Sequence, residues 1–428
     1  MKRMQTWVVD WKKKFLSFNR NIKLFMLANV LIQIGMGVFM VMYNLYIKEL
    51  GMPESINGKV ISMTALASAI MLIPAGFLSD RFGRKWTIVG GAVLGALTLF
   101  YRSFAVAELP LVTAAFLTGL FMAFVQVSGI PFLAEHSKAS ERVHLFSMYF
   151  ALMTLANVLG SLLGGVVSDA LQWLLAMDAV HAIRWSLLFG SLLYAFGLIP
   201  LLRLSNQKPP GEEKINTRID IDAADARLSK NLVAIFHFSF ASLLIGLGSG
   251  LVVPYLNLYF SNRFEASNTY IGLILALGSA MTVVATLIGP LLVNKVGKVK
   301  AMLLFQLLSI PFLILTAYTT SLLLASLGFL LRQALMNAGN PIQSAIAMEV
   351  VHDKYKGLAN SANQMVFNIG WAAMGPIAAG LVISFGSYWG YAYAFTITAA
   401  LYCISAIYYY FIFGKRKLAE TKKEWLTD

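Results

Sequence analysis

Charged residues and cysteine are scarce in this chain. Only 13% of its 428 residues are charged, whereas 58% are hydrophobic and the mean hydropathy is +0.70. A soluble core cannot bury that much apolar surface, so the composition excludes a soluble globular protein and indicates that lipid is the solvent. The single cysteine, Cys403, excludes a disulfide framework and a metal site built from several cysteines.

Carboxylates are also few, and they avoid the middle of the apolar runs. The chain has 20 Asp and Glu residues against 34 Lys and Arg residues, and the stretches at 24–47 and 109–133 hold no carboxylate. No nucleophile, base and orienting acid occur together at a usable spacing. We therefore expect neither an enzyme nor a bound cofactor or metal.

Long apolar runs are abundant. A membrane-spanning helix needs about 20 apolar residues. Runs of this kind lie at 24–48, 57–79, 86–106, 109–134, 144–168, 185–202, 232–260, 269–293, 300–318, 321–348, 358–385 and 389–413. The sequence therefore predicts an all-α integral membrane protein with twelve transmembrane helices.

Lys and Arg residues gather on one side of these spans. Twenty-eight of the 34 fall on the side that holds the N-terminus and one, Arg332, lies inside a span. The other side has five: Lys48, Lys59, Arg102, Arg184 and Arg263. By the positive-inside rule this split predicts a protein of the cell membrane with both termini in the cytoplasm. The net charge of +14 then reflects topology and contact with membrane lipids, so we expect no nucleic-acid partner.

The two halves of the sequence repeat each other. Asp80 follows Gly58 at the same interval at which Asn294 follows Gly272 (80−58 equals 294−272). A duplicated unit of six helices explains this spacing. The expected segments are a cytoplasmic tail at 1–22, a bundle at 23–202, a polar linker at 203–231, a second bundle at 232–413 and a second tail at 414–428.

The first tail has a regular aromatic stripe, formed by Trp7, Trp11, Phe15 and Phe18. Spacings of four, four and three residues place these side chains on one face of a helix. An amphipathic helix on the inner leaflet is therefore expected. A disordered basic tail is the alternative.

The segment between the second and third apolar runs carries the most specific motif. It reads Gly76-Phe-Leu-Ser-Asp80-Arg81-Phe-Gly83-Arg84-Lys85. This loop resembles the signature loop of the major facilitator superfamily of secondary transporters, and it is closest to the branch of drug and metabolite antiporters. The resemblance covers the whole chain in topology, but only this loop and its weaker copy at 294–298 are specific in sequence. It implies two pseudo-symmetric six-helix bundles with a substrate site near the midplane between them.

In transporters of this kind the loop acts as a cytoplasmic latch. The resemblance implies that Asp80 faces the helix that starts near 357–360, where free amides favour an anion. Arg84 would pair with Asp80 or Glu135, and Arg142 with Glu135. The implied latch residues are Gly76, Asp80, Arg81, Gly83, Arg84, Lys85, Glu135 and Arg142. The alternative is that these charges only set the topology.

Two glycine-rich stretches, at 160–165 and 375–380, resemble the glycine and proline motif of antiporters in the same superfamily. Ser161 stands at the position of the proline in the first stretch. Small residues at such spacing also serve plain helix packing. Both interpretations stay open here, and the first favours export.

Arg332 is the cation inside a span. It precedes Glu349 on the same apolar run (349−332), which places it roughly 25 Å from the cytoplasmic end of its helix. An unpaired cation at this depth is costly, so we expect it to be functional. It could contact an anionic or carbonyl-bearing substrate, form a salt bridge with Asp169 or Asp178, or lie at the rim. The arginine of helix 4 and the acid of helix 1 that occur in drug and proton antiporters are missing.

The expected cavity combines amides and phenols with many apolar side chains. Such a lining suits an amphipathic organic solute better than a bare ion, although each amide could instead bond across a helix interface. The candidate substrate-binding residues are Gln33, Tyr43, Asn44, Gln126, Tyr255, Asn257, Arg332, Gln333, Asn337, Asn368 and Trp371.

These patterns predict a monomeric secondary transporter that works by alternating access. We expect it to export an amphipathic, anionic small molecule against an ion gradient, with protons as the expected ion. Import of a small polar metabolite by symport is the alternative within the class. A lipid scramblase or a receptor without transport is the alternative of another class.

Overall fold

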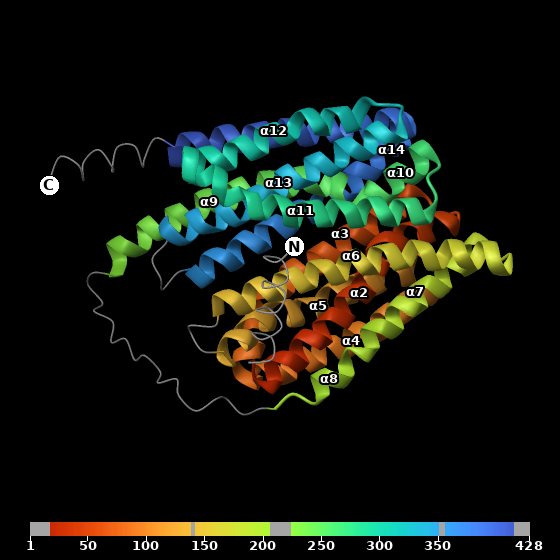
Figure 1. Ribbon diagram of the computed structural model, residues 1–428, viewed down its shortest axis with the longest axis horizontal. Coiled ribbons are helices and arrows are strands. Elements are labelled where there is room, and N and C mark those ends of the chain that lie inside the picture. Colours follow the sequence, from red (N-terminus) through yellow and green to blue (C-terminus); the bar gives the residue numbers. More distant parts are fainter. Residues whose placement is uncertain (1–17, 138–141, 206–223, 351–355, 415–428) are drawn as a thin grey trace, which may run out of the picture.

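The structure is a computed structural model that describes residues 18–137, 142–205, 224–350 and 356–414. Within these residues every regular element is a helix, and the long helices run side by side along the long axis of the molecule (Figure 1). We call the end at which α2 (Arg20–Glu49) begins and the described chain ends the terminal side. The other end is called the opposite side.

Each half of the chain contributes one series of helices. The first half holds α2, α3 (Glu54–Phe82), α4 (Arg84–Phe104), α5 (Glu108–Glu135), α6 (Arg142–Leu175), α7 (Ala179–Phe196) and α8 (Leu198–Leu202). The second half holds α9 (Ala224–Val252), the short turn η1 (Val253–Tyr255), α10 (Leu256–Phe264), α11 (Asn268–Val296), α12 (Lys298–Tyr318), α13 (Leu322–Val350), α14 (Lys356–Tyr409) and the closing turn η3 (Tyr410–Gly414).

The number of membrane crossings depends on one glycine. Eleven helices in the described residues are long and apolar enough to cross a membrane. The last of them, Ala362–Phe413, contains most of α14, a helix of 54 residues that includes Gly386 at φ 73° and ψ 174°. These dihedrals interrupt the helix and suit glycine alone. Gly386 therefore divides α14 into two crossing segments, which brings the total to the twelve spans expected from the sequence.

Capping residues, rather than hydropathy, decide where the helices begin. α2 begins at Arg20 instead of residue 24, because the Asn19 Oδ1 accepts a hydrogen bond of 2.8 Å from the N–H of Ile22. α7 begins at Ala179 instead of residue 185, because Asp178 accepts one of 3.2 Å from the N–H of His181. These caps extend the helices beyond the apolar stretches that hydropathy detects.

The expected tails and linker fall largely outside the described residues. The tail at 1–22 is described only from residue 18, so the aromatic stripe before Phe18 lies outside the described part, and the tail at 414–428 is described only at its first residue. The linker at 203–231 is described up to residue 205 and again from residue 224, where α9 begins. The last part of that segment is therefore helical, because its residues are mostly good helix formers.

Two tight turns repeat between the halves. Gly83 joins α3 to α4 with φ 91°, and Gly297 joins α11 to α12 with φ 83°. Only glycine adopts such angles without strain. The offset between these two positions equals the offset between Gly58 and Gly272 (297−83 equals 272−58). The sequence repeat therefore corresponds to a repeat in backbone conformation.

The two halves meet along α3 with α14 and along α6 with α11, and α2 contacts α10 between these pairs. Glycines allow the close approach. A Cβ atom added at Gly58 would lie 2.7 Å from the Gly375 carbonyl oxygen, and one added at Gly165 would lie 2.2 Å from the Asn268 carbonyl oxygen. Small residues at these crossings let the backbones of opposite halves come into contact.

Gly160 provides a test of the packing within the first half. Its Cβ in an alanine variant would lie 2.0 Å from the Ile34 carbonyl oxygen of α2. We expect Gly160→Ala to cost about 1–3 kcal/mol through overpacking, measured as a lower unfolding temperature of the purified protein. Gly380→Ala is the control, because no atom lies within 4 Å of its added Cβ. Equal unfolding temperatures for the two variants would contradict the close crossing of α2 and α6.

Candidate functional site

Two asparagines bind the halves together near the opposite side. The Asn44 Nδ2 donates to the Pro254 carbonyl oxygen at 2.7 Å, and the Asn257 Nδ2 donates to the Val41 carbonyl oxygen at 2.7 Å. Asn44 is 8% exposed and Asn257 is 1% exposed. The two residues occupy equivalent places in the repeat, and each bonds to the backbone of the other half. Neither amide is open to a ligand in this structure.

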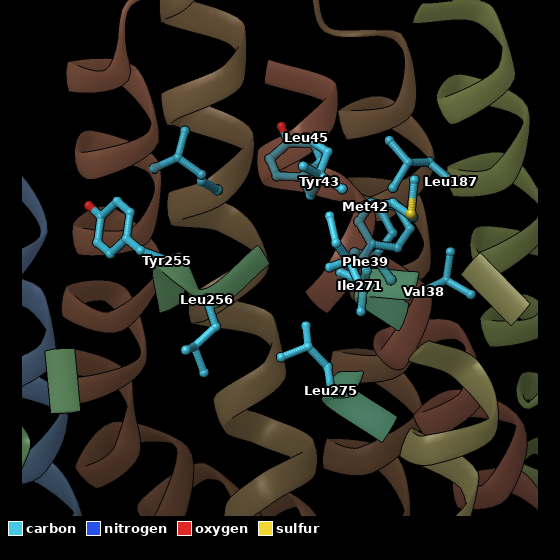
Figure 2. Close-up of a cluster of buried hydrophobic side chains, with 14 of the residues drawn as sticks. Val38, Phe39, Met42, Tyr43, Leu45, Leu187, Tyr255, Leu256, Ile271 and Leu275 are labelled. Atoms are coloured by element: carbon cyan, nitrogen blue, oxygen red, sulfur yellow. The ribbon is translucent and has the colours of Figure 1, made fainter. Parts of the chain in front are cut away.

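A buried apolar cluster includes chain neighbours of both asparagines, namely Tyr43, Leu45 and Leu256. Figure 2 shows its residues, which come from both halves: Val38, Phe39, Met42, Tyr43, Leu45 and Leu187 from the first, and Tyr255, Leu256, Ile271 and Leu275 from the second. Burying an aliphatic or aromatic side chain of this size contributes about 1.5–3 kcal/mol relative to leaving it in water. The cluster therefore closes the path between the halves on the opposite side.

Both tyrosines of this cluster that were expected in the cavity are buried. Tyr43 is 2% exposed, and the Arg102 guanidinium carbon lies 3.7 Å from its ring centroid. Tyr255 is 1% exposed, and its hydroxyl donates to the Gly375 carbonyl oxygen at 2.6 Å. In this conformation the two phenols are part of the closure.

Polar contacts between the halves continue outward from the cluster. The Lys48 Nζ donates to the Ser261 Oγ at 2.7 Å, and the Asn262 Nδ2 donates to the Glu54 Oε1 at 2.8 Å. These bonds join α2 and α3 to α10. They add to the closure at the outermost turn of the helices.

Asp169 of α6 makes a charged contact across the same boundary. Its Oδ2 accepts a hydrogen bond of 2.7 Å from the backbone N–H of Thr269, in the first turn of α11. Beside it, the Asn268 Nδ2 donates to the Ser168 Oγ at 3.2 Å. A helix N-terminus has free N–H groups and a positive dipole end, so it favours a carboxylate. Asp169 therefore links the halves only while their ends on the opposite side are in contact.

Toward the terminal side the described contacts between the halves become fewer. Several hydrogen bonds join described residues of the two halves. The one nearest the terminal side runs from the Gln126 Nε2 to the Gln364 Oε1 at 3.3 Å. Gln126 lies before the end of α5 at Glu135 (135−126), which is roughly 13 Å along the helix. Both amides are exposed. The described polar contacts thus hold the halves together mainly at the opposite side.

Arg332 is buried among helices of the second half. It is 3% exposed, its Nη2 donates to the Tyr402 hydroxyl at 2.8 Å, and its Nη1 donates to the Gln333 Oε1 at 2.8 Å. Its Nε is buried and has no hydrogen-bond partner among the described residues. A position at the rim is excluded by this burial. The guanidinium instead carries its charge inside the protein, and its Nε–H donor is not used by any described residue.

The two aspartates considered as partners of Arg332 bind elsewhere. Asp169 accepts from Thr269, as described above. Asp178 accepts from the backbone N–H of His181, and this hydrogen bond lowers the pKa of its carboxyl group. The salt bridge that the sequence left open is therefore not formed with either residue. No ion pair of Arg332 with a carboxylate occurs in the part of the chain that the structure describes.

The other expected cavity residues fall into separate groups. Gln333 and Asn337 lie with Arg332 on α13, and the Asn337 Nδ2 donates to the Gln333 carbonyl oxygen at 2.8 Å. Trp371 donates from its Nε1 to the Ser249 Oγ at 2.6 Å. Gln33 and Asn368 are half-buried. The structure thus places a polar cluster around Arg332 and leaves Gln126 apart from it.

Part of the signature loop lies in the described residues. The Arg84 Nε is 3.2 Å from the Glu135 Oε1, and its Nη1 donates to the Ser79 Oγ at 2.9 Å. The Arg84–Glu135 pair joins α4 to α5. It is one of the two pairings expected for Arg84. The side chains of Asp80 and Arg142 lie outside the described residues. Their contacts therefore stay predictions.

The glycine-rich stretches serve as packing surfaces. Gly160 and Gly164 face α2, where added Cβ atoms would lie 2.0 Å from the Ile34 carbonyl oxygen and 3.2 Å from the Val38 Cα. Gly375 faces α3, with the Ser62 Oγ at 2.2 Å from an added Cβ. Packing alone explains these small residues, so they do not decide between export and import.

Sequence reasoning missed two residues of this arrangement. Tyr402 was not expected to hold Arg332, because it lies 70 positions away in an apolar helix without a polar pattern. Asp169 was considered only as a partner of Arg332. A signal was available for its true contact, since Ser267-Asn268-Thr269 is a typical helix start and so offers free amides.

Comparison with known proteins decides the family. A family model described as "Major Facilitator Superfamily" matches residues 25–236 and 238–426, which is nearly the whole chain. The chain belongs to the Major Facilitator Superfamily. It is 23% identical over 364 residues to an uncharacterised MFS-type transporter of Methanocaldococcus jannaschii, covering 82% of this chain and 88% of the relative. It is 25% identical over 403 residues to the multidrug resistance protein MdtG of Proteus mirabilis, covering 92% and 95%.

Solved structures of this superfamily have the same fold. A bacterial homologue of the human lysosomal transporter Spinster, in an inward-facing and unoccupied conformation, matches with a TM-score of 0.73 at 15% identity, covering 91% of this chain and 95% of that one. The protein is therefore an all-α MFS transporter that crosses the membrane many times, and it is not an enzyme. Within the described residues no group of three or more His, Cys, Asp or Glu could hold a metal ion.

Proposed function

We propose that this transporter moves an amphipathic, anionic organic molecule by alternating access. The observation that carries the proposal is the buried Arg332 guanidinium, which has two neutral partners and a free Nε among the described residues. A cation inside a membrane protein without a carboxylate partner is costly and marks a functional position. An anionic group of the substrate would supply the missing charge.

The surroundings of Arg332 support a partly apolar substrate. Gln333 and Asn337 provide amides on the same helix, and the Tyr402 hydroxyl of α14 contacts the guanidinium. We infer that Asn368 and Trp371, which lie earlier on α14, line the same pocket. Most other side chains of these helices are apolar. A pocket with a few directing polar groups among apolar ones suits an amphipathic organic solute.

The transport cycle follows from where the halves touch. In the structure the opposite side is closed by the asparagine pair, the apolar cluster and Asp169. We infer that the bundles at 23–202 and 232–413 rock against each other, so that this closure opens when the terminal side closes. The loop of Asp80, Arg81, Gly83, Arg84 and Lys85, with Glu135 and Arg142, would then serve as the latch of the terminal side.

The direction and the energy source are part of the same proposal. We infer that the protein exports its substrate from the cytoplasm across the cell membrane, with both termini in the cytoplasm and a proton gradient as the driving force. The charge asymmetry of the loops supports the orientation. The similarity to a multidrug resistance protein supports export.

A transport assay tests this function. Purified protein would first be screened for thermal stabilisation by matched anionic, neutral and cationic amphiphiles, because a ligand that binds the folded state raises the unfolding temperature. The stabilising compound would then be followed in proteoliposomes with an imposed pH gradient. We expect accumulation against the concentration gradient that stops when an ionophore dissipates the pH difference. Movement that only equilibrates the compound, with no response to the gradient, would contradict active transport.

A further inference from the structure

A groove runs along the outside of the first half, between α3, α4 and α5. It has a volume of about 300 Å³ and is lined mainly by apolar side chains, among them Leu78, Phe82, Trp86, Leu94 and Phe124. Phe82, Trp86 and Leu94 are 60%, 55% and 41% exposed. Exposed apolar side chains are ordinary on a lipid-facing surface. What distinguishes this patch is that its surface is hollowed.

Two consecutive glycines form the floor of this groove. Gly91 lets α5 approach α4, because an added Cβ would lie 2.6 Å from the Phe124 Cβ. Gly90 faces outward, and no atom lies within 4 Å of its added Cβ. The groove therefore exists because Gly91 lets the two helices come close together and Gly90 leaves the outer face of α4 without a side chain.

Basic side chains lie at the terminal-side end of the groove. The Arg81 guanidinium carbon is 5.8 Å from the Phe82 ring centroid, and the Lys85 Nζ is 4.8 Å from the Trp86 ring centroid. Both cations thus lie over aromatic rings that line the groove. Neither forms an ion pair with a carboxylate in the described part of the chain.

The start of α4 adds further positive potential at this end. Its cap residue is Gly83, which has no side chain to accept from the first N–H groups. Such groups and the positive end of the helix dipole favour an anion. The apolar groove thus leads to two cations and to an uncapped helix start. In a membrane, a lipid with an anionic headgroup has the matching combination of an apolar chain and a negative charge.

We propose that one anionic phospholipid binds in this groove. One of its two acyl chains lies over Gly90 between Trp86 and Leu94, and its phosphate group lies between Arg81, Lys85 and the first turn of α4. The site is separate from the proposed substrate site, because it lies on the outer surface of the first half whereas Arg332 is buried in the second half.

The repeat provides an internal comparison. At the offset that relates Gly83 to Gly297, Gly90 and Gly91 correspond to Leu304 and Phe305, and Trp86 corresponds to Lys300. The second half therefore also has basic residues around the start of α12, among them Lys295 and Lys300. It has no pair of glycines on α12. A site that needs only positive charge would occur in both halves. A site that needs the groove occurs in the first half alone.

Native mass spectrometry of the full chain in detergent, titrated with phosphatidylglycerol or phosphatidylcholine, tests the proposal. We expect the wild type to bind one phosphatidylglycerol about 30-fold more tightly than phosphatidylcholine, which is the effect of two basic residues beside an anionic headgroup. The double variant Arg81→Gln/Lys85→Gln should lose this preference. Gly90→Leu should lose the tight site while the protein stays folded, because its side chain enters open space.

The variant Lys295→Gln/Lys300→Gln is the matched control, since it removes the same charge from the same level of the second half. It should bind phosphatidylglycerol like the wild type. Equal binding of both lipids by the wild type would overturn the proposal. So would an equal loss of preference in both double variants, which would reduce the effect to overall charge. Competition by inorganic phosphate at the concentration of the lipid would overturn it as well, because it would point to a phosphate site without a role for the groove.

Discussion

Replacing Arg332 by glutamine is expected to remove most of the stabilisation that an anionic ligand gives to this protein. The guanidinium is 3% exposed, bonds to Tyr402 and Gln333, and retains a free Nε among the described residues. A hydrogen bond to a charged group contributes about 1.5–3 kcal/mol. Loss of the bond between the guanidinium and the anionic group of the ligand should therefore weaken ligand binding about 10- to 100-fold. Isothermal titration calorimetry with the anionic compound of the thermal screen measures this change directly.

The control must separate a binding role from a structural role. Arg332→Gln leaves the Tyr402 hydroxyl with a weaker donor, and a buried group that loses its partner costs about 1–3 kcal/mol. Tyr402→Phe removes that hydroxyl while keeping the cation. If Arg332 binds the substrate, Tyr402→Phe should lower the unfolding temperature but retain the preference for anions. Loss of stability in both variants without any change in ligand preference would make Arg332 a structural residue.

Replacing Asp169 by alanine is expected to shift the protein toward a conformation that is open on the opposite side. The carboxylate accepts from the Thr269 N–H at the start of α11, which belongs to the other half. A carboxylate at a helix N-terminus contributes roughly 0.3–2 kcal/mol, depending on burial. Because the contact exists only in the closed state, its loss should change the ratio of the two states by up to about 30-fold.

Distances between paired spin labels would reveal the shift. Trp173 on α6 and Leu323 on α13 are 84% and 65% exposed near the opposite side, in different halves, and serve as label positions after Cys403 is replaced. The long-distance population should grow in Asp169→Ala. The matched control is Asp178→Ala, since Asp178 also accepts from a helix start, but that helix lies in its own half. An equal change in both variants would contradict the proposed link between the halves.

Replacing Asp80 is expected to shift the conformational equilibrium in the direction opposite to that of the Asp169 variant. The resemblance of its loop implies that it faces the start of α14 when the terminal side is closed. Asp80→Asn should then favour the form that is open on the terminal side, and labels near the opposite side should show fewer long distances. The two aspartates would thus act as latches at the two ends of the molecule.

The fold could be predicted because each of its parts leaves a local signal. Apolar runs gave twelve spans, and the structure has them once α14 is divided at Gly386. The spacing of Gly58, Asp80 and Gly83 against Gly272, Asn294 and Gly297 revealed the repeat. Only helix ends were misplaced, because caps such as Asn19 and Asp178 lie outside the apolar stretch.

The candidate site could be predicted only in part. The cost of a buried cation singled out Arg332, but its partner Tyr402 comes from a distant helix that is apolar nearly all round. The expected amides divided into those that close the opposite side, such as Asn44 and Asn257, and those near Arg332. No periodicity separates these groups, because both lie on helices whose faces look alike in sequence.

By itself, the sequence determined the solvent, the number of crossings, the duplication and the family motif. Each of these depends on composition or on short spacing along the chain, and hydrophobicity and backbone sterics act locally. Only the tertiary structure decided that Asn44 and Asn257 bind reciprocally, that Asp169 contacts Thr269, and that Gly90 leaves a groove open beside Arg81 and Lys85. Those contacts join residues far apart in the chain, and they depend on how whole helices pack.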